Sequence, residues 1–423
     1  MSPFTRAFRS RVGGGLAAVA TTAALVLAGA PVAQAEDVRA RQWYLDAMKA
    51  EEMWKVSTGK GITVAVLDSG VDPTVPELRG KVLPGPDMVD EVVGAGDDDS
   101  GATQYNGGHG TTMAAYIAGT GAGGGLKGLA PDATILTVKV GLPGSEGIFL
   151  SVEPMTKAIR YAVDHGSRVI NLSIGALAAK KEHEAELQAA IDYALGKGAL
   201  IFASTGNEGD ELDLYPAKMR GVVAVGALDT KGKVAKFSNY GDHVGLAAAG
   251  DQLPGRCEKD KTRFCTKFGT SGATAIASAS AALIWSAHPD WTNNQVLRVM
   301  METAGHNGPV PSKYIGFGGV RPAQVLLEGK GDPGPADVNP LLAARGQASP
   351  APGGSAVPKN SPSPESTGAG GEDGRSKESQ AAPEAAAGSG EGGFPLWAIV
   401  ASAVAVVTVI GAVVAVSVRR RRA

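Results

Sequence analysis

The chain of 423 residues is long enough for two or three domains, and its 40 lysines and arginines nearly balance its 42 aspartates and glutamates. Three arginines lie in residues 1–35 and four at the C-terminus, so the rest carries 33 basic against 42 acidic residues, a net charge of about −9. Nothing in this balance favours binding to nucleic acid, which requires a basic face.

Residues 1–35 have the composition of a secretory signal peptide. Three arginines and no acidic residue precede an apolar run that ends near Ala30, and Ala33-Gln34-Ala35 supplies a small-residue cleavage site. We expect cleavage after Ala35 and export of the chain that follows. A retained N-terminal anchor is the alternative.

Residues 36–56 are predicted to form an N-terminal extension. Within it, Trp43, Ala47 and Trp54 are spaced as on one face of a helix, which predicts one amphipathic helix docked on the next domain. The extension is too short for a separately folding propeptide, so we expect it to wrap on the domain and to need no removal.

Residues 57–328 are predicted to form one α/β domain. Glycine-bounded apolar runs of the kind that form buried parallel strands recur at 62–70, 133–140, 167–173, 198–204 and 221–227. Helical patterns at 151–165 and 182–197 lie between some of these runs. The alternation predicts a doubly wound, mostly parallel sheet flanked by helices, with functional groups beyond the carboxyl ends of the strands.

The C-terminal part is predicted to be a stalk, a membrane anchor and a tail. Residues 329–394 are rich in Pro, Gly, Ala, Ser and Glu and poor in large apolar residues, which favours a disordered stalk. Residues 395–418 contain a run without charge that is long enough to span a bilayer of ~30 Å, with a buried core helix as the alternative. The arginines of 419–423 predict a cytoplasmic tail, and therefore a single-pass cell-membrane protein whose domain lies outside the cell.

Only two cysteines occur in the chain, Cys257 and Cys265. In an exported protein such a pair most simply forms one disulfide, here closing a small charged loop. A metal site would need further ligands nearby, and the sequence offers none.

Four polar residues in glycine-rich turns carry the candidate chemistry. Asp68 ends the first predicted strand, His109 opens a small-residue helix, Asn207 follows a buried strand, and Ser271 opens the apolar helix behind GTSGAT. Each alone has a purely structural interpretation, such as a helix cap for the serine. Together they supply a nucleophile, a base, an acid that orients the base, and a donor for an oxyanion.

The order of these residues resembles that of the subtilisin-type proteases. The resemblance extends over about residues 43–327 and rests on the motifs VAVLDSGVD, GGHGTT, INLSIG, TGNEG and GTSGAT. It implies that Ser271 attacks the peptide carbonyl, that His109 moves the proton and that Asp68 orients His109. Asn207 would complete the oxyanion hole. Ser173 and Gly175 would belong to an exposed strand that binds the substrate backbone.

The layout of signal, protease domain, stalk, anchor and tail is similar to that of the mycosins, membrane-anchored serine proteases associated with type VII secretion in actinobacteria. The resemblance implies an extracellular endopeptidase that processes few protein substrates beside a secretion apparatus and needs no cofactor. Two alternatives stay open. One is a weak or inactive protease that serves as a structural part of that apparatus, and the other is a general nutrient protease at the cell surface.

The chain departs from the family pattern behind the serine. Ala275 stands where a proline is usual, which leaves the path of the helix open, and Gly272 stands where a larger residue is usual, which predicts a looser turn. The acidic run Asp97-Asp98-Asp99 suggests structural calcium, as many relatives bind, although a solvated loop is the favoured interpretation.

Overall fold

The computed structural model describes residues 38–89, 108–141, 148–149, 152–177, 179–257, 260 and 262–349. The predicted signal peptide, membrane helix, tail and Asp97-Asp98-Asp99 lie outside these residues. Within them, no helix is both long and apolar enough to cross a membrane.

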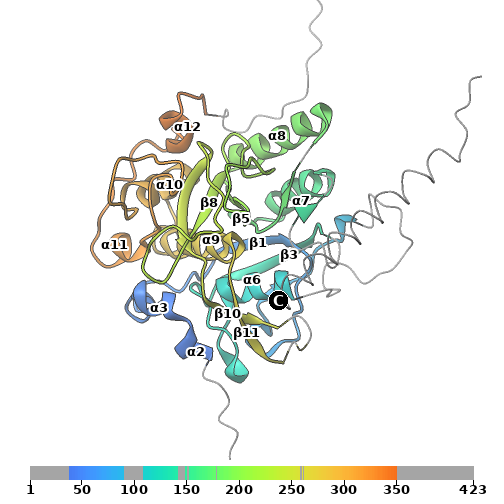
Figure 1. Cartoon of the computed structure of the whole chain (residues 1–423), viewed down its shortest axis with the longest axis vertical. Helices are drawn as coiled ribbons and strands as arrows, with labels where there is room; N and C mark the ends of the chain where they lie inside the picture. The colour runs from blue at the N-terminus through green and yellow to red at the C-terminus, as the bar shows by residue number, and fades with distance from the viewer. Residues whose placement is uncertain are drawn as a thin grey trace, which may run out of the picture. The chain divides into compact units, whose positions relative to one another are not determined.

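A seven-stranded parallel sheet forms the centre of the domain (Figure 1). In spatial order its strands are β2 (Val82–Leu83), β3 (Thr134–Lys139), β1 (Thr63–Asp68), β5 (Val169–Leu172), β7 (Leu200–Ser204), β8 (Val223–Leu228) and β9 (Val244–Ala249). The five predicted strands are confirmed, whereas β2 and β9 are additional. Strand β1 has β3 as its neighbour on one side and β5 on the other, and the chain builds the sheet outward in both directions from β1. Asp68, at the end of β1, therefore lies where the strand order reverses.

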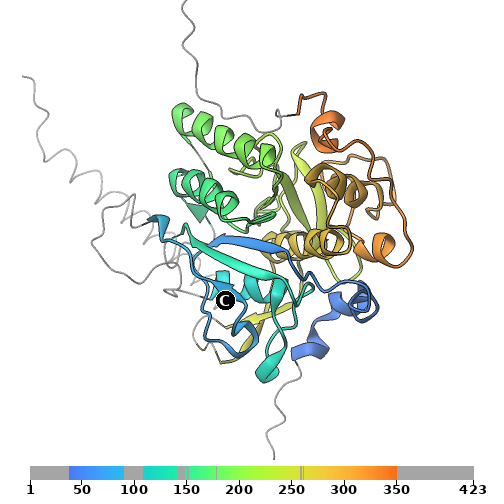
Figure 2. The same cartoon turned by 180° about the vertical axis from the view of Figure 1, so that it is seen from behind.

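Both faces of the sheet are covered by helices, as the doubly wound prediction requires. Alternate residues of a strand point to opposite faces. In β1, Val64 and Val66 therefore join one hydrophobic core, while Ala65 and Leu67 join the other. Helices α6 (His109–Ala118) and α9 (Thr270–Ala287) cover the first face, and α7 (Glu153–Asp164) and α8 (Lys181–Gly196) cover the second (Figure 2).

Short elements complete the domain. They are the helices α10 (Asn293–Glu302) and α11 (Pro322–Leu326), the 3₁₀ turns η1 (Pro76–Leu78) and η3 (Ala122–Gly124), the antiparallel pair β10 (Leu253–Arg256) and β11 (Phe264–Lys267), and the parallel pair β4 (Ile148–Phe149) and β6 (Gly175–Ala176). A disulfide between Cys257 and Cys265 closes the end of the β10–β11 hairpin, as predicted. The sequence pattern did not indicate this hairpin.

The N-terminal extension lies on the domain, but the prediction of one helix was wrong. The structure has three short helices, α2 (Val38–Arg41), α3 (Trp43–Ala47) and α4 (Ala50–Met53). Lys49 adopts a left-handed backbone with φ of 60°, which breaks the helix between α3 and α4. The break lets two tryptophans reach different places, because the Trp43 indole donates to the Asp251 carbonyl and the Trp54 indole donates to the Leu129 carbonyl.

The folded region continues beyond the predicted boundary at residue 328. Residues 329–349 are part of the domain and include α12 (Pro340–Ala344), which packs against α10. The side chains of Leu341 and Leu342 are fully buried, and the Asn339 side chain caps the helix by accepting from their backbone N–H groups. The predicted boundary was too early, because two leucines in an otherwise polar stretch are too weak a sequence signal for a folded segment.

Candidate active site

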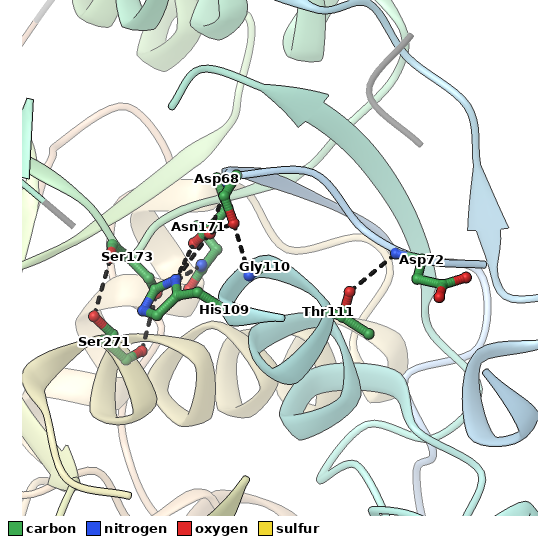
Figure 3. Close-up of polar contacts among 9 residues, drawn as sticks. Asp68, Asp72, His109, Gly110, Thr111, Asn171, Ser173 and Ser271 are labelled. Atoms are coloured by element: carbon green, nitrogen blue, oxygen red, sulfur yellow. Dashed lines mark hydrogen bonds and ion pairs between the residues drawn. The ribbon is translucent and has the colours of Figure 1, made fainter. Parts of the chain in front are cut away.

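Asp68 and His109 form a hydrogen-bonded pair at the carboxyl end of β1 (Figure 3). The His109 Nδ1 atom lies 2.8 Å from Asp68 Oδ1 and 3.0 Å from Oδ2. A carboxylate can only accept, so Nδ1 carries the proton and Nε2 is left as the basic nitrogen. The Asp68 side chain is fully buried, whereas 38% of the His109 side chain is exposed. The pair therefore has a fixed inner end and an accessible outer end.

The close approach of α6 to β1 depends on a glycine. A β-carbon at Gly110 would lie 2.3 Å from the Gly70 carbonyl oxygen and 3.1 Å from the Asp68 β-carbon. Ser69 also fixes the carboxylate, because its N–H and hydroxyl donate to Asp68 Oδ1 at 2.7 and 3.1 Å. The motifs around Asp68 and His109 thus supply the packing that brings the two side chains together.

The environment of His109 favours a charged imidazolium. Burial lowers the pKa of His109, but the charge and the hydrogen bond of Asp68 raise it by more, and the charge of Lys267 lowers it again to a smaller extent. The pKa of His109 is raised above its usual 6.5 as a result. A base held in this way is stabilised at the moment when it takes up a proton.

Ser271 is the second residue of α9, which packs against α6, so the serine and the histidine come from neighbouring helices (Figure 3). Its hydroxyl donates to the Ser173 carbonyl at 3.0 Å, and the Ser173 hydroxyl donates to the Ser271 carbonyl at 2.9 Å. The proton of Ser271 is therefore directed at Ser173 in this conformation. Rotation about the Cα–Cβ bond is needed to direct it toward His109.

A buried polar chain that the sequence analysis did not identify supports Ser173. The Asn171 amide donates to the Ser173 hydroxyl at 3.0 Å, and the Ser278 hydroxyl donates to the Asn171 amide oxygen at 3.1 Å. Asn171 and Ser278 are fully buried. A polar residue within the apolar strand VINL was the signal that could have drawn attention to Asn171.

Asn207 faces the start of α9 with a defined amide orientation. Its Oδ1 accepts from the Thr270 backbone N–H at 2.8 Å and from the Thr270 hydroxyl at 3.1 Å. The oxygen is thereby used for anchoring, and the NH₂ group is the end that can donate to another molecule. The Ser271 N–H has no acceptor within α9, because the first N–H groups of a helix lack one. Two donors that are able to hold a single anionic oxygen thus lie beside the Ser271 side chain.

Ser173 and Gly175 are not exposed, which differs from the prediction. Ser173 and the following Ile174 are each 1% exposed, and Gly175 is buried in β6, which pairs with β4. The segment also has an inward neighbour, since Ala176 and Tyr215 exchange two backbone hydrogen bonds of 2.8 and 2.9 Å. Contacts with the serine and with the core cover this segment, and they could not be seen from the sequence.

The residues behind the serine are closely packed. Helix α9 runs without interruption from Thr270 to Ala287, with Ala275 fully buried. A β-carbon at Gly272 would lie 2.6 Å from Leu253 Cδ1 of β10. The expectation of a looser turn was therefore wrong, because Leu253 occupies the space that a side chain at position 272 would need.

Among the residues that the structure describes, no group of three or more His, Cys, Asp or Glu side chains could hold a metal ion.

Comparison with known proteins gives one consistent result. The sequence pattern of the Subtilase family matches residues 59–318. The chain is 34% identical over 267 residues to the thermophilic serine proteinase of Bacillus sp. (strain AK1), a match that covers 63% of this chain and 62% of that one. The chain thus spans less than two thirds of the length of that relative.

Solved structures of similar fold include MycP1 from Mycobacterium smegmatis, with a TM-score of 0.58 and 27% identity over 70% of this chain and 86% of that one. They also include the MycP3 protease from the type VII (ESX-3) secretion system, with a TM-score of 0.56 and 30% identity over 67% of this chain and 87% of that one.

Proposed function

The chain belongs to the subtilase family of serine proteases, and we propose that it hydrolyses peptide bonds through Ser271, His109 and Asp68. The observation that carries the proposal is the hydrogen bond between His109 Nδ1 and the buried carboxylate of Asp68. Helix α6, which bears His109, packs against α9, which bears Ser271. A base fixed in one tautomer beside a helix-terminal serine is the arrangement that acyl transfer needs.

The first chemical step follows from these positions. The Ser271 hydroxyl leaves the Ser173 carbonyl, gives its proton to His109 Nε2 and attacks the substrate carbonyl carbon. The imidazolium that forms is stabilised by Asp68 and then protonates the leaving amine. Water repeats the sequence with the acyl-enzyme, which releases the acid and restores the serine.

The negative oxygen of the tetrahedral intermediate is stabilised by the Asn207 NH₂ group and the Ser271 N–H. Both groups are positioned before reaction, Asn207 by its bonds to Thr270 and Ser271 by the start of the helix. Donors that need no reorientation lower the barrier more than flexible ones. We assign Ser173 and Gly175 to the wall against which the substrate backbone lies, since the Ser173 carbonyl directly contacts the nucleophile.

Labelling with a fluorophosphonate tests the proposal. The reagent should modify wild-type protein at Ser271 and should fail with Ser271→Ala. Ser286→Ala, on the same helix, is the matched control, since its hydroxyl contacts only the Lys60 carbonyl away from the site. Equal labelling of wild type and Ser271→Ala would contradict the proposal. Absence of labelling in folded wild type would instead favour an inactive structural protein.

The cellular setting is a further part of the proposal. We propose a membrane-anchored protease outside the cell that processes selected proteins beside type VII secretion machinery. Support comes from the charge-free run at 395–418, the arginines that follow it, and the fold shared with a protease named for such a system. In the producing cells, the full chain should stay in membranes washed with alkaline carbonate, and a chain ending at residue 394 should be released. Release of both would contradict the anchor.

Substrate range separates this role from that of a nutrient protease. The proposed enzyme should leave unfolded casein largely intact at a concentration at which the fluorophosphonate labels it fully. Broad cleavage of casein would favour the nutrient role.

A further inference from the structure

One leucine fills the space between Gly175 and Gly206. A β-carbon added at Gly206 would lie 2.7 Å from Leu214 Cδ1, and one added at Gly175 would lie 3.1 Å from the same atom. Leu214 is only 2% exposed. Its side chain thus ends between the two glycines, in contact distance of both chain segments that bear them.

These two segments also frame the serine. Ser173, two residues before Gly175, accepts the hydrogen bond of the Ser271 hydroxyl. Gly206 directly precedes Asn207, the side chain of which anchors the start of α9. A carbonyl carbon bonded to Ser271, with its oxygen on the Asn207 amide, must therefore place its own residue between the segment of Gly175 and the turn of Gly206.

Leu214 cannot easily leave this space. The backbone of the next residue, Tyr215, exchanges hydrogen bonds of 2.8 and 2.9 Å with Ala176 of β6. The Leu214 carbonyl accepts from the Lys218 N–H at 2.9 Å. The backbone that follows the leucine is thus fixed. Moving the leucine would also leave a cavity between buried walls, which is unfavourable.

On the basis of the proposed protease function, we infer that Leu214 closes the pocket for the residue before the scissile bond. The enzyme therefore cleaves after glycine, alanine or serine and excludes leucine, phenylalanine and other large residues. Leu214 takes volume between Gly175 and Gly206 that a large substrate side chain would need. Asn239 and Glu208 fill the space on the Gly206 side. Each methylene too many or too few in such a pocket changes the rate by about 10- to 200-fold.

Competition against fluorophosphonate labelling tests this inference. Acetyl-Ala-Ala-Ala-X aldehydes, with alanine, leucine or phenylalanine as X, add reversibly to a catalytic serine hydroxyl and slow the labelling. They are compared on wild type, Leu214→Gly and Leu214→Ala. The matched control is Leu212→Gly, a half-buried leucine two residues earlier in the same loop.

We expect the alanine aldehyde to protect wild type at a concentration at least ~100-fold below that of the phenylalanine aldehyde. Leu214→Gly should lower the ratio of the phenylalanine to the alanine aldehyde concentration that protects by at least ~10-fold. Leu214→Ala should lower this ratio less, and Leu212→Gly should leave it unchanged. Equal protection of wild type by the alanine and phenylalanine aldehydes would overturn the inference, as would an unchanged ratio in both Leu214 variants. Failure of the proposed protease function would give a different result, because folded wild type would then take no label at all.

Discussion

The two sides of the candidate active site differ in their hydrogen-bond partners. Asp68 and His109 lie on one side and Ser271 lies on the other. The acid and the base are already paired at 2.8 Å, and Ser69 and Gly110 hold them there. The Ser271 hydroxyl instead donates to the Ser173 carbonyl at 3.0 Å. The fold thus holds the proposed acid and base as a pair, whereas the proposed nucleophile donates its proton to another acceptor.

Redirecting the hydrogen bond of the serine changes the free energy little, whereas losing the Asp68–His109 pair has a large effect. Exchanging one neutral hydrogen bond for another changes the free energy by about 1 kcal/mol. Loss of the orienting carboxylate, by contrast, removes the stabilisation of the imidazolium. Substitutions on the two sides should therefore have very different effects.

The largest effect is expected on the paired side. Asp68→Asn keeps the size of the side chain but removes the charge that fixes the His109 tautomer. We expect kcat on a peptide substrate to fall by about 10⁴-fold, with KM changed much less. Steady-state kinetics measure both constants, and thermal unfolding checks that the variant is folded. A folded variant with a loss below tenfold would contradict the assigned role.

The next effect concerns the oxyanion. Asn207→Ala removes one of two donors, and we expect kcat to fall by about 10²–10³-fold, the loss known for such a donor in subtilisin. Because Asn207 also anchors Thr270, the substitution could disturb α9 itself. Thr270→Val, which removes the hydroxyl contacts to Asn207 and to the Gly206 backbone but keeps the Asn207 NH₂ group, is the control and should cost much less activity. A similar loss in both variants would assign Asn207 a purely structural role.

Packing behind the nucleophile should give an intermediate effect. A methyl group at Gly272 meets Leu253 Cδ1 at 2.6 Å, so Gly272→Ala should destabilise the fold by about 1–3 kcal/mol and shift Ser271. Leu253→Ala in the same chain removes the clashing atom. The double variant should regain labelling rate relative to Gly272→Ala, which a double-mutant cycle measures as coupling. Purely additive effects would show that the two residues do not meet.

The smallest effect is a shift of the pH profile. His109 must be neutral to accept the proton, and its pKa is raised by Asp68 against the opposing effect of burial. The kcat/KM of wild type should therefore fall as pH drops through a midpoint above 6.5. In Asp68→Asn the midpoint of the residual activity should move to lower pH. A wild-type profile that is flat from about pH 5 to 9 would contradict a histidine base.

Much of the fold was predictable because buried parallel strands have a strong local signal. The apolar run before Asp68 and the one before Asn207 become β1 and β7, which confirms the doubly wound sheet. The edge strand β2 has two residues and β9 is dominated by small side chains, so neither stood out. The single helix predicted at the N-terminus failed because Lys49 takes a left-handed backbone that allows two tryptophans to anchor on the domain.

The sequence marks the candidate site residues, whereas their surroundings could not be predicted from it. Glycine-rich turns mark Asp68, His109, Asn207 and Ser271 in the sequence. The burial of Ser173, by contrast, depends on chain segments far apart in the sequence. The occupation of space by Leu214 and Leu253 likewise arises only when distant loops meet. Local patterns identify chemical groups, but the shape of the space around them is a tertiary property.

The most direct measurement is the second-order rate constant for fluorophosphonate labelling of wild type and His109→Ala at one pH. If His109 activates Ser271, the rate constant should fall by at least ~10³-fold in a variant that still unfolds cooperatively. Equal rate constants in the two proteins would show that Ser271 reacts without His109, and would contradict the account of the site.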